Sequence, residues 1–469
     1  MAAALLYPAT AMLRSLFILA ILVPGLLASI RSRYAALVMY LWFALFRPQD
    51  WLWIDITSLR LSLVLGVLLL LPGLVSGIVP NLTHPLSVGM IMFFLSALVS
   101  QAHAVNPAFG WVWVDFLGRL LLACMMITTL ANNSKRIAGV VGIVGGSLGF
   151  HAAKAGLAYV VGGGTRFADG LSGAFVDNNG YALGTVMIMP MLLVTAQNID
   201  LIYDGRFLKW LRRGLYGAVM LCAFAVVGTY SRGGFLSLSG AGLVYVLLQK
   251  RRFTALASVL AVVSLFLAVV PIPESYLKRL ETIQTYEKVG EDSALSRPHF
   301  WKVGLRMVTE NPFGVGLKQY EFAYDKYDFL HGRFGSRRAV HNSHVQVLAE
   351  LGYMGEAAWA GLFVYAFIVC IRVRSRSKSE RLDTRTAYFL FTAANGLLTS
   401  MTGFLIGGTF LSLALNDLTW LTFGMVAAVD RMSAKCLAEP VRQRLAPAPV
   451  VPLAFRVVPS YSTSRGNAV

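Results

Sequence analysis

The sequence predicts an all-α protein that spans a membrane many times. Of its 469 residues, 57% are hydrophobic and only 14% are charged, whereas a soluble domain carries roughly a quarter charged residues. The mean hydropathy is +0.64. Apolar runs close to the ~20 residues that cross a bilayer recur along most of the chain. We therefore expect a polytopic integral membrane protein with about 12 transmembrane helices.

Thirteen apolar runs are candidates for these helices. The run at 34–46 is short for a bilayer span, and a count of twelve places both chain ends in the cytoplasm. The first run lacks a small-residue cleavage site, so we expect a retained helix and not a cleaved signal peptide. The candidates are 13–30, 34–46, 62–79, 86–103, 112–131, 137–161, 180–197, 213–230, 234–249, 254–272, 352–371, 387–408 and 411–429.

Positive charge sets the predicted orientation. Lys+Arg number 41 against 23 Asp+Glu, a net charge of +18. The basic residues cluster in short loops at alternate turns, as the positive-inside rule requires of cytoplasmic loops. We therefore expect this charge to set topology and to meet membrane lipids, and we expect no nucleic acid partner. The basic loops are Lys135-Arg136, 206–213, 250–252 and 372–385.

The longest outward-facing segment, 273–351, is expected to fold as a helical cap. It mixes acidic and basic residues and contains an amphipathic stretch at 297–310. The cap separates an N-terminal transmembrane bundle at 1–272 from C-terminal transmembrane helices at 352–430. Residues 431–469 are Pro-rich and basic, which is typical of a disordered cytoplasmic tail.

A histidine motif stands where the predicted cap meets the next membrane helix. A helix that begins near Asn342 would align His341, His344, Gly352 and Gly355 on one stripe, and the two glycines would let another helix approach closely. The alternative for Asn342 is a helix cap. A zinc site made by the two histidines and an acid has no support from an H-E-x-x-H pattern or a cysteine cluster. We therefore expect no metal site here.

Three arginines at outward-facing positions are candidates for binding an anion. Arg232 stands in a short turn between two apolar helices, where following glycines would expose backbone amides beside the guanidinium. Arg297 and Arg166 are the second and third candidates, because a guanidinium stays charged and binds phosphate bidentately. The alternative for each is an interfacial arginine that extends its charge to water. Asn178 and its neighbours in the Asp-Asn-Asn sequence either cap the next helix or line the same cavity.

Four motifs carry a resemblance to a known family. Together they resemble the signatures of the O-antigen ligase family, whose superfamily also includes O-antigen polymerases and bacterial O-oligosaccharyltransferases. The most N-terminal of them is similar to ligases associated with the exosortase A system. The motifs are F-R-P-Q-D-W at 46–51, S-R-G-G at 231–234, N-P-F-G-V-G at 311–316 and H-N-x9-G-x-x-G from His341 to Gly355.

The resemblance implies a GT-C-like glycosyltransferase in the bacterial inner membrane, with its active site facing the periplasm. Such enzymes move a glycan from undecaprenyl diphosphate to an acceptor hydroxyl without a nucleotide sugar, a metal or a cofactor. The sequence contains neither a D-x-D triplet nor a P-loop. The implied activity is that of an O-antigen ligase in lipopolysaccharide biosynthesis, with the lipid A core as acceptor and membrane lipids as surroundings.

The same resemblance assigns roles to the candidate residues. His341 matches the family position, and an imidazole suits a general base because its ordinary pKa lies close to neutrality. Arg232 and Arg297 are expected to hold the diphosphate, because fixed cations stabilise the charge that builds on the leaving oxygen. Attack opposite the diphosphate would invert the anomeric centre. The further substrate-binding candidates are Arg166, Arg337, Arg338, Asn342, His344 and Asn178.

The acceptor stays open between three related activities. A ligase would use the lipid A core, a protein O-oligosaccharyltransferase a secreted protein, and an O-antigen polymerase a second lipid-linked glycan. The ligase is favoured because the sequence has a single long loop and no added soluble domain for protein recognition. A lipid-linked glycan transporter belongs to a different class and would need polar residues along its spans. Asp115, Arg119 and Lys154 are charged exceptions within the apolar runs.

Overall fold

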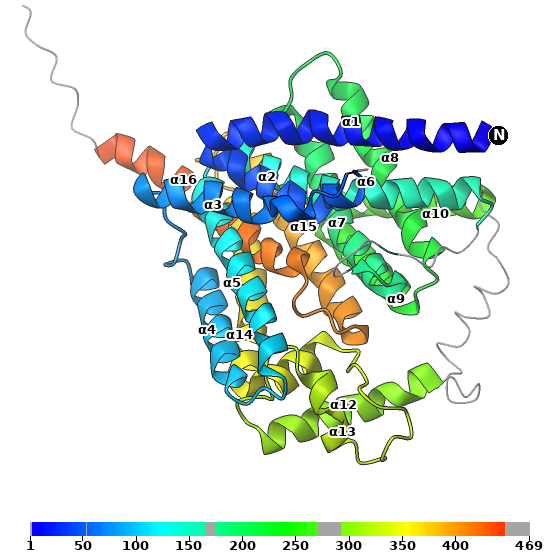
Figure 1. Cartoon of the computed structure of the whole chain (residues 1–469). Coiled ribbons are helices and arrows are strands. Elements are labelled where there is room, and N and C mark those ends of the chain that lie inside the picture. Colours follow the sequence, from blue (N-terminus) through cyan, green and yellow to red (C-terminus); the bar gives the residue numbers. More distant parts are fainter. Residues whose placement is uncertain (1, 53, 165–169, 171–174, 270–291, 446–469) are drawn as a thin grey trace, which may run out of the picture.

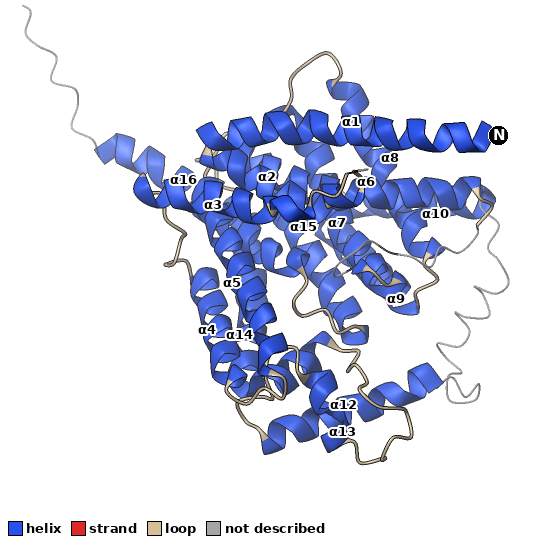
Figure 2. Ribbon diagram, in the orientation of Figure 1, coloured by secondary structure: helices blue, strands red, loops and turns tan. Residues whose placement is uncertain are grey.

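The protein is a bundle of long helices with a smaller helical group at one end (Figure 1). The computed structural model describes residues 2–52, 54–164, 170, 175–269 and 292–445, and Figure 2 shows that these residues form helices and loops without a strand. The predicted all-helical fold is therefore confirmed for the described ranges. The helices are α1 (Ala2–Arg31), α2 (Arg33–Phe46), α3 (Leu61–Val75), α4 (Pro85–Gln101), α5 (Pro107–Leu130), α6 (Ser134–Val161), α7 (Asn178–Asn198), α8 (Leu208–Gly228), α9 (Arg232–Leu248), α10 (Arg252–Val269), α12 (Asp292–Glu310), α13 (Tyr320–Tyr327), α14 (Ser343–Arg376), α15 (Thr384–Gly407) and α16 (Asp417–Leu445).

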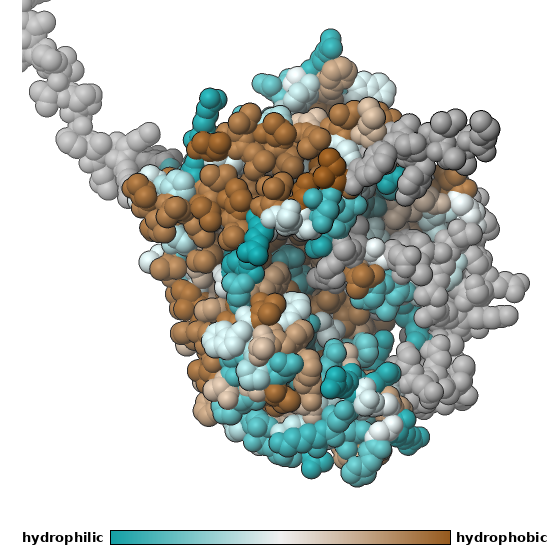
Figure 3. All heavy atoms as spheres, in the orientation of Figure 1, coloured by the Kyte–Doolittle hydropathy of each residue, from teal (hydrophilic) through white to brown (hydrophobic). Residues whose placement is uncertain are grey.

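The chain is a multi-pass membrane protein. Eight stretches of the described helices are long and apolar enough to cross a membrane, and four further apolar helices are shorter. In Figure 3, hydrophobic residues cover much of the visible bundle, whereas hydrophilic residues gather over the end formed by α12 and α13. The total of twelve spans stays a prediction. The eight stretches are Met12–Arg31, Thr57–Val75, Pro107–Leu130, Ser134–Val161, Asn178–Leu201, Leu208–Gly228, Ser343–Arg376 and Thr384–Phe410.

Small residues allow the membrane helices to pack closely. A Cβ atom at Gly156 in α6 would lie 1.8 Å from the carbonyl oxygen of Leu221 in α8. A Cβ atom at Gly424 in α16 would lie 2.8 Å from the carbonyl oxygen of Cys124 in α5. Because dispersion and close backbone approach, not hydrophobicity, drive helix association in lipid, these contacts hold the bundle together.

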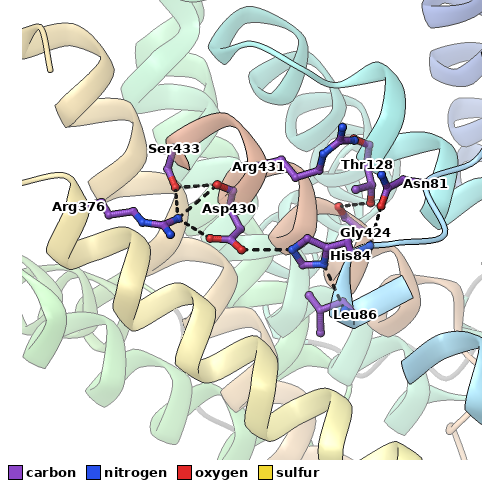
Figure 4. A network of polar contacts seen from close by, with 9 residues as sticks. All are labelled: Asn81, His84, Leu86, Thr128, Arg376, Gly424, Asp430, Arg431 and Ser433. Atoms are coloured by element: carbon purple, nitrogen blue, oxygen red, sulfur yellow. Dashed lines mark hydrogen bonds and ion pairs between the residues drawn. The ribbon is translucent and has the colours of Figure 1, made fainter. Parts of the chain in front are cut away.

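A polar network fastens the end of the bundle remote from α12 and α13 (Figure 4). The Asp430 carboxylate of α16 lies 3.2 Å from His84 Nε2 before α4 and accepts a hydrogen bond of 2.6 Å from Arg376 at the end of α14. Arg376 also donates to Ser433 Oγ at 2.8 Å. A carboxylate in this partly buried position needs such partners, so the network fixes α4, α14 and α16 relative to one another.

The two helices α12 and α13 form a small core of their own. Phe300, Val303 and Met307 recur at helical spacing on α12 and are buried against Tyr320 and Tyr324 of α13. The Tyr320 hydroxyl donates to the Phe300 carbonyl at 2.6 Å. We call this unit, residues 292–342, the cap.

A buried contact between a histidine and an aspartate stabilises the cap. His299 Nε2 lies 2.8 Å from Asp328 Oδ1, and the Asp328 carboxylate also accepts hydrogen bonds from the backbone N–H groups of Leu330 and Gly332. Burial by itself would raise the pKa of Asp328, but the N–H groups of Gly332 and Leu330 and the His299 ring outweigh it and hold that pKa below its ordinary value.

The cap is joined to the bundle at a break in α14. Gly352 adopts φ 70° and ψ −167°, which interrupts the helix in a conformation that favours glycine. The break frees the carbonyl groups of Ala349 and Glu350, which accept hydrogen bonds of 3.1 Å from the N–H groups of Val315 and Gly316. The N-P-F-G-V-G motif therefore satisfies the polar groups that the kink would otherwise leave unpaired.

Further contacts lock the same joint. The Tyr353 N–H group donates to the Pro312 carbonyl at 3.0 Å, and a Cβ atom at Gly352 would lie 2.1 Å from that oxygen. The Glu350 carboxylate accepts from the Lys318 N–H group at 2.8 Å and from Gln346 at 3.2 Å. Two glycine-containing motifs far apart in the sequence thus form one structural unit.

Two expectations from the sequence are wrong, one about Gly352 and one about the C-terminal tail. Gly352 does not share a continuous helical stripe with the histidines, because its backbone is not helical and the loop at 312–314, not another helix, packs against it. Gly355 does lie close to a helix, since its Cβ position is 3.2 Å from Ser96 of α4. The predicted disordered tail begins too early, because α16 continues to Leu445. Residues 446–469 of that tail lie outside the described residues.

Candidate functional site

A cavity of about 400 Å³ lies where the cap meets the bundle. It is formed by α12, the last residues of the cap, the N-terminus of α7 and the connection between α15 and α16. Its described lining residues are Asp177, Asn179, Ser296, Arg297, Phe300, Arg338, Ala339, His341, Phe410, Leu411, Ser412 and Leu413. Segments from four distant parts of the sequence therefore build one site.

His341 is held in the wall of this cavity by its backbone. The residue has φ 50°, in the left-handed region that few non-glycine residues adopt, and its N–H group donates to Ser412 Oγ at 2.9 Å. Directly after it, the Asn342 side chain caps α14 by accepting from the N–H groups of His344 and Val345. The turn and the cap together place the imidazole at the cavity and not on the helix.

The surroundings of His341 favour its neutral form. Burial lowers its pKa, and the guanidinium groups of Arg297 and Arg338 lower it further, whereas Asp177 acts in the opposite direction. A neutral imidazole is the form that can accept a proton. The cavity therefore presents a base that is available at and below neutral pH.

Two arginines bring positive charge to the same cavity. The Arg297 guanidinium lies over the ring of Phe410, 5.8 Å from its centroid, and the Arg338 guanidinium lies over Phe300 at 5.7 Å. Arg297 belongs to α12 and Arg338 to the loop before His341, so two separate elements position them. Stacking on an aromatic ring orients a planar guanidinium while leaving its charge in place. The site can therefore hold an anion beside a base.

The Asp-Asn-Asn sequence at the start of α7 acts both as a helix cap and as part of the cavity wall, the two interpretations that the sequence left open. Asp177 caps α7, because its Oδ1 atom accepts hydrogen bonds of 2.9 Å from the N–H groups of Asn179 and Gly180. Asp177 and Asn179 also line the cavity. Asn178 turns elsewhere and donates from Nδ2 to the Thr229 carbonyl at 3.0 Å, which ties the start of α7 to the end of α8.

Arg232 is not among the lining residues of the cavity. It is the first residue of α9, which Ser231 caps by accepting from the Gly234 N–H group. The neighbouring Gly233 packs on the site, since a Cβ atom there would lie 3.2 Å from Phe410. The structure thus brings Arg297 and Arg338 to the cavity itself, whereas in the Arg232-Gly233 pair it is Gly233 that lies against the lining residue Phe410.

The remaining predicted site residues that the structure describes lie outside the cavity lining. Arg337 donates its N–H group to Asp325 at 2.9 Å, and its guanidinium stacks over Phe322. His344 Nδ1 accepts a hydrogen bond of 3.1 Å from Trp359 within α14. Asn342 is buried as the cap of the same helix. Arg166 lies outside the described residues.

Several lining residues could not be predicted from the sequence. Ser412 and Phe410 stand in an apolar run after α15 that carried no sign of a site. Contacts bring this run to the start of α14, because Ser343 Oγ donates to the Leu411 carbonyl at 2.7 Å and accepts from the Leu413 N–H group at 3.0 Å. Only the repeated small and polar residues near 407–412 could have indicated an irregular connection there.

No cluster of three or more His, Cys, Asp or Glu side chains among the described residues is arranged as metal ligands. The groups that the cavity offers to a ligand are guanidinium, imidazole, carboxylate, carboxamide and hydroxyl groups. This set suits a ligand that combines an anion with hydroxyl groups.

Comparisons with known families agree with the motifs. Residues 217–360 match the family model described as O-antigen ligase. This range contains α9, the described cap and the start of α14, and with them Arg232, Arg297 and His341. Residues 13–198 match a family model described as a family of unknown function. No curated protein matches the chain. The predicted resemblance to the O-antigen ligase family is therefore confirmed for the segment that carries the histidine.

Proposed function

With residues 217–360 assigned to the O-antigen ligase family, we propose that the protein is an inverting glycosyltransferase of the bacterial inner membrane. It moves O-antigen glycan from undecaprenyl diphosphate to the lipid A core on the periplasmic face. The observation that supports this proposal is the shared cavity, in which His341, Arg297 and Arg338 meet at the boundary between the apolar bundle and the cap.

The diphosphate of the donor is assigned to Arg297 and Arg338. Both guanidinium groups line the cavity, and each is stacked on a ring and so restricted in orientation. Two fixed cations can contact two phosphate groups and stabilise the charge that develops as the glycosidic bond breaks. Arg232, one residue from the glycine on Phe410, remains a candidate for the phosphate nearer the lipid. The polyprenyl chain would lie along the apolar helices.

His341 is assigned as the general base. Its neutral imidazole takes the proton of the acceptor hydroxyl while the hydroxyl oxygen forms a bond to the anomeric carbon. The bond from that carbon to the diphosphate oxygen breaks, and its electron pair stays on the leaving undecaprenyl diphosphate. Because the acceptor attacks opposite the leaving group, the anomeric configuration inverts. The imidazolium then releases its proton to water, and no metal takes part.

The three charged residues that a transporter could use, as singled out from the sequence, have local partners. Asp115 and Arg119 pair with each other one turn apart on the surface of α5, and the Lys154 ammonium lies over the Trp51 ring at 5.0 Å. These groups have neighbours of their own, and none of them lines the cavity. The lipid A core is preferred to a protein or a lipid-linked acceptor because the chain has one long loop of moderate size and no added soluble domain for protein recognition. The experiment below distinguishes the three acceptors.

The test is glycan transfer by the purified full-length protein in EDTA. Undecaprenyl-diphosphate glycan is the donor, and lipid A core, an acceptor protein or a second donor molecule is offered in separate reactions. Transfer to lipid A core that is lost in His341→Ala and Arg338→Ala supports the proposal. Arg333→Ala is the matched control, because Arg333 is an exposed cap arginine stacked on Phe334 and not among the lining residues.

Each outcome has a defined meaning. Transfer only to a protein or to a second lipid-linked glycan would keep the mechanism and replace the acceptor. Transfer that EDTA abolishes would refute the metal-free reaction. Undiminished transfer by His341→Ala would refute the assignment of the base.

A further inference from the structure

The cavity contains one acidic side chain among several basic ones. Of the described lining residues, Arg297 and Arg338 are cationic, His341 is titratable and Asp177 is the one with a carboxylate. The charged groups come from three elements: Arg297 from α12, Arg338 from the loop that carries His341, and Asp177 from the start of α7. The fourth wall, at 410–413, contributes a phenylalanine, two leucines and a serine and adds no titratable group.

Proton transfer changes the charge balance of this site. When a base accepts the proton of an acceptor hydroxyl, His341 becomes a cation next to two guanidinium groups. Like charges at short range in a partly desolvated cavity disfavour that state. Diphosphate offsets the arginines, but its charge moves away with the leaving group. A fixed negative charge near the imidazole would therefore assist the transfer.

We propose that Asp177 is a positioning residue that stabilises the protonated form of His341 across the cavity during glycan transfer. This inference rests on the proposed function, since it assigns Asp177 a role in the same reaction. It adds a third element, the N-terminus of α7, to the groups that act on the acceptor. It also gives the Asp-Asn-Asn sequence a function beyond capping the helix.

Backbone hydrogen bonds fix the position of the Asp177 carboxylate, as this role requires. Its Oδ1 atom accepts two backbone hydrogen bonds of 2.9 Å at the start of α7, which fix the carboxylate relative to the helix. The adjacent Asn178 ties the same turn to the Thr229 carbonyl. The carboxylate acts on His341 in the expected sense, because Asp177 raises the pKa of His341 while burial, Arg297 and Arg338 lower it.

The substitution Asp177→Asn separates charge from structure. Asparagine is about as good a helix cap as aspartate, so the start of α7 should persist while the negative charge is lost. Without that charge, the pKa of His341 falls further. The acid limb of the transfer rate then moves to lower pH, and the rate on the plateau falls because the protonated base loses its partner. We expect a loss of about tenfold, a fraction of the 10²–10⁴ that a general base contributes.

A matched control exists at the other end of the bundle. Asp383 caps α15 in the same way, with its carboxylate accepting from the Thr386 N–H group at 2.9 Å, and it is exposed. Asp383→Asn removes the same charge from the same kind of position and should leave both the pH profile and the plateau unchanged. Asp177→Ala, which also removes the cap, shows the cost of losing the helix start.

Two measurements test the proposal. The first is the rate at which diethyl pyrocarbonate labels His341, followed by mass spectrometry against pH in the full-length protein. Since this reagent reacts with neutral imidazole, the profile reports the pKa of His341 without any glycan transfer. Asp177→Asn should shift the profile to lower pH, and Asp383→Asn should not. An unshifted profile in Asp177→Asn would overturn the proposal whether or not the protein transfers glycan.

The second measurement is a double-mutant comparison. If Asp177 acts through His341, Asp177→Asn should cause no further loss of transfer in a His341→Ala background. Equal fold-losses in both backgrounds would overturn the proposal and indicate an independent contact, for example with a sugar hydroxyl. Absence of transfer by the native protein with every acceptor would count against the proposed function, while the labelling profile would still report the link between Asp177 and His341.

Discussion

Replacing Gly352 by alanine should undock the cap from the bundle. The Cβ atom would lie 2.1 Å from the Pro312 carbonyl oxygen, 2.6 Å from the Phe313 carbonyl carbon and 2.7 Å from the Gly314 nitrogen. All three neighbours are backbone atoms, so no flexible side chain can move aside. The φ of 70° with ψ of −167° adds strain, because this region is essentially restricted to glycine and costs another residue about 1–3 kcal/mol.

The expected magnitude follows from these contacts. Relieving the overlap requires the 312–316 loop to shift, which costs about 1–3 kcal/mol in a packed region. The shift also weakens the hydrogen bonds that Val315, Gly316 and Tyr353 make across the joint, each worth about 1 kcal/mol. We expect the docked state to lose about 4 kcal/mol, which corresponds to an opening equilibrium larger by about a thousandfold.

Hydrogen exchange measures this opening directly. In detergent or nanodiscs, the protection of the N–H groups of Val315, Gly316 and Tyr353 should fall by about a thousandfold in Gly352→Ala. Gly361→Ala on the same helix is the control, since nothing lies within 4 Å of its Cβ position. It should be neutral or stabilise the helix by about 0.5–1 kcal/mol. Unchanged protection in Gly352→Ala would refute the idea that this glycine is needed for the docking of the loop.

Four further outcomes are expected. Arg338→Ala should lower the rate of transfer by about 10²–10³-fold, as for the loss of one group that stabilises a leaving charge, measured with saturating acceptor. Since the pKa of His341 is lowered, wild-type transfer should stay high below the pH at which an ordinary histidine protonates and fall only as pH drops through the lowered pKa. The pKa of Asp328 is also lowered in the folded protein. The stability that its carboxylate gives the cap should therefore be complete above the unfolded pKa of aspartate and be lost as the pH falls through the folded pKa. Thermal unfolding measured against pH should show this dependence in the native protein and not in Asp328→Asn. Asp430→Ala should lower the free energy of unfolding by about 3 kcal/mol, because Arg376 stays partly buried and loses its carboxylate partner. The affinity of the folded protein for the donor should not change, since Asp430 does not line the cavity.

The helical architecture and the place of His341 at the cavity could be predicted from the sequence because their signals are local. Apolar runs, basic loops and the Asn342 cap each depend on residues a few positions apart. His341 was found through a motif of fifteen residues, and it does line the cavity. Its role as the base stays a prediction.

The rest of the site depends on contacts between distant segments. The backbone of Gly352 departs from the helix only because the loop near residue 314 supplies hydrogen bonds to the broken turn, and no helical periodicity can reveal that exchange. Phe410 contacts both Gly233 and the Arg297 guanidinium, which lie more than 60 positions apart in the sequence, so no local pattern indicates which arginine lines the cavity. Ser412 joins the site through a bond across 71 positions, which no local pattern records.

The bond from His341 to Ser412 has a consequence for building chimaeric proteins. The backbone turn that holds the imidazole is completed by the connection between α15 and α16, which lies beyond the segment that matches the ligase family. A hybrid that joins residues 217–360 of this chain to the C-terminal helices of a relative would therefore replace the cavity wall at 410–413. It would also replace Ser412, which accepts the hydrogen bond from the His341 N–H group. A hybrid that keeps this cavity requires residues 410–413 to be transferred together with His341.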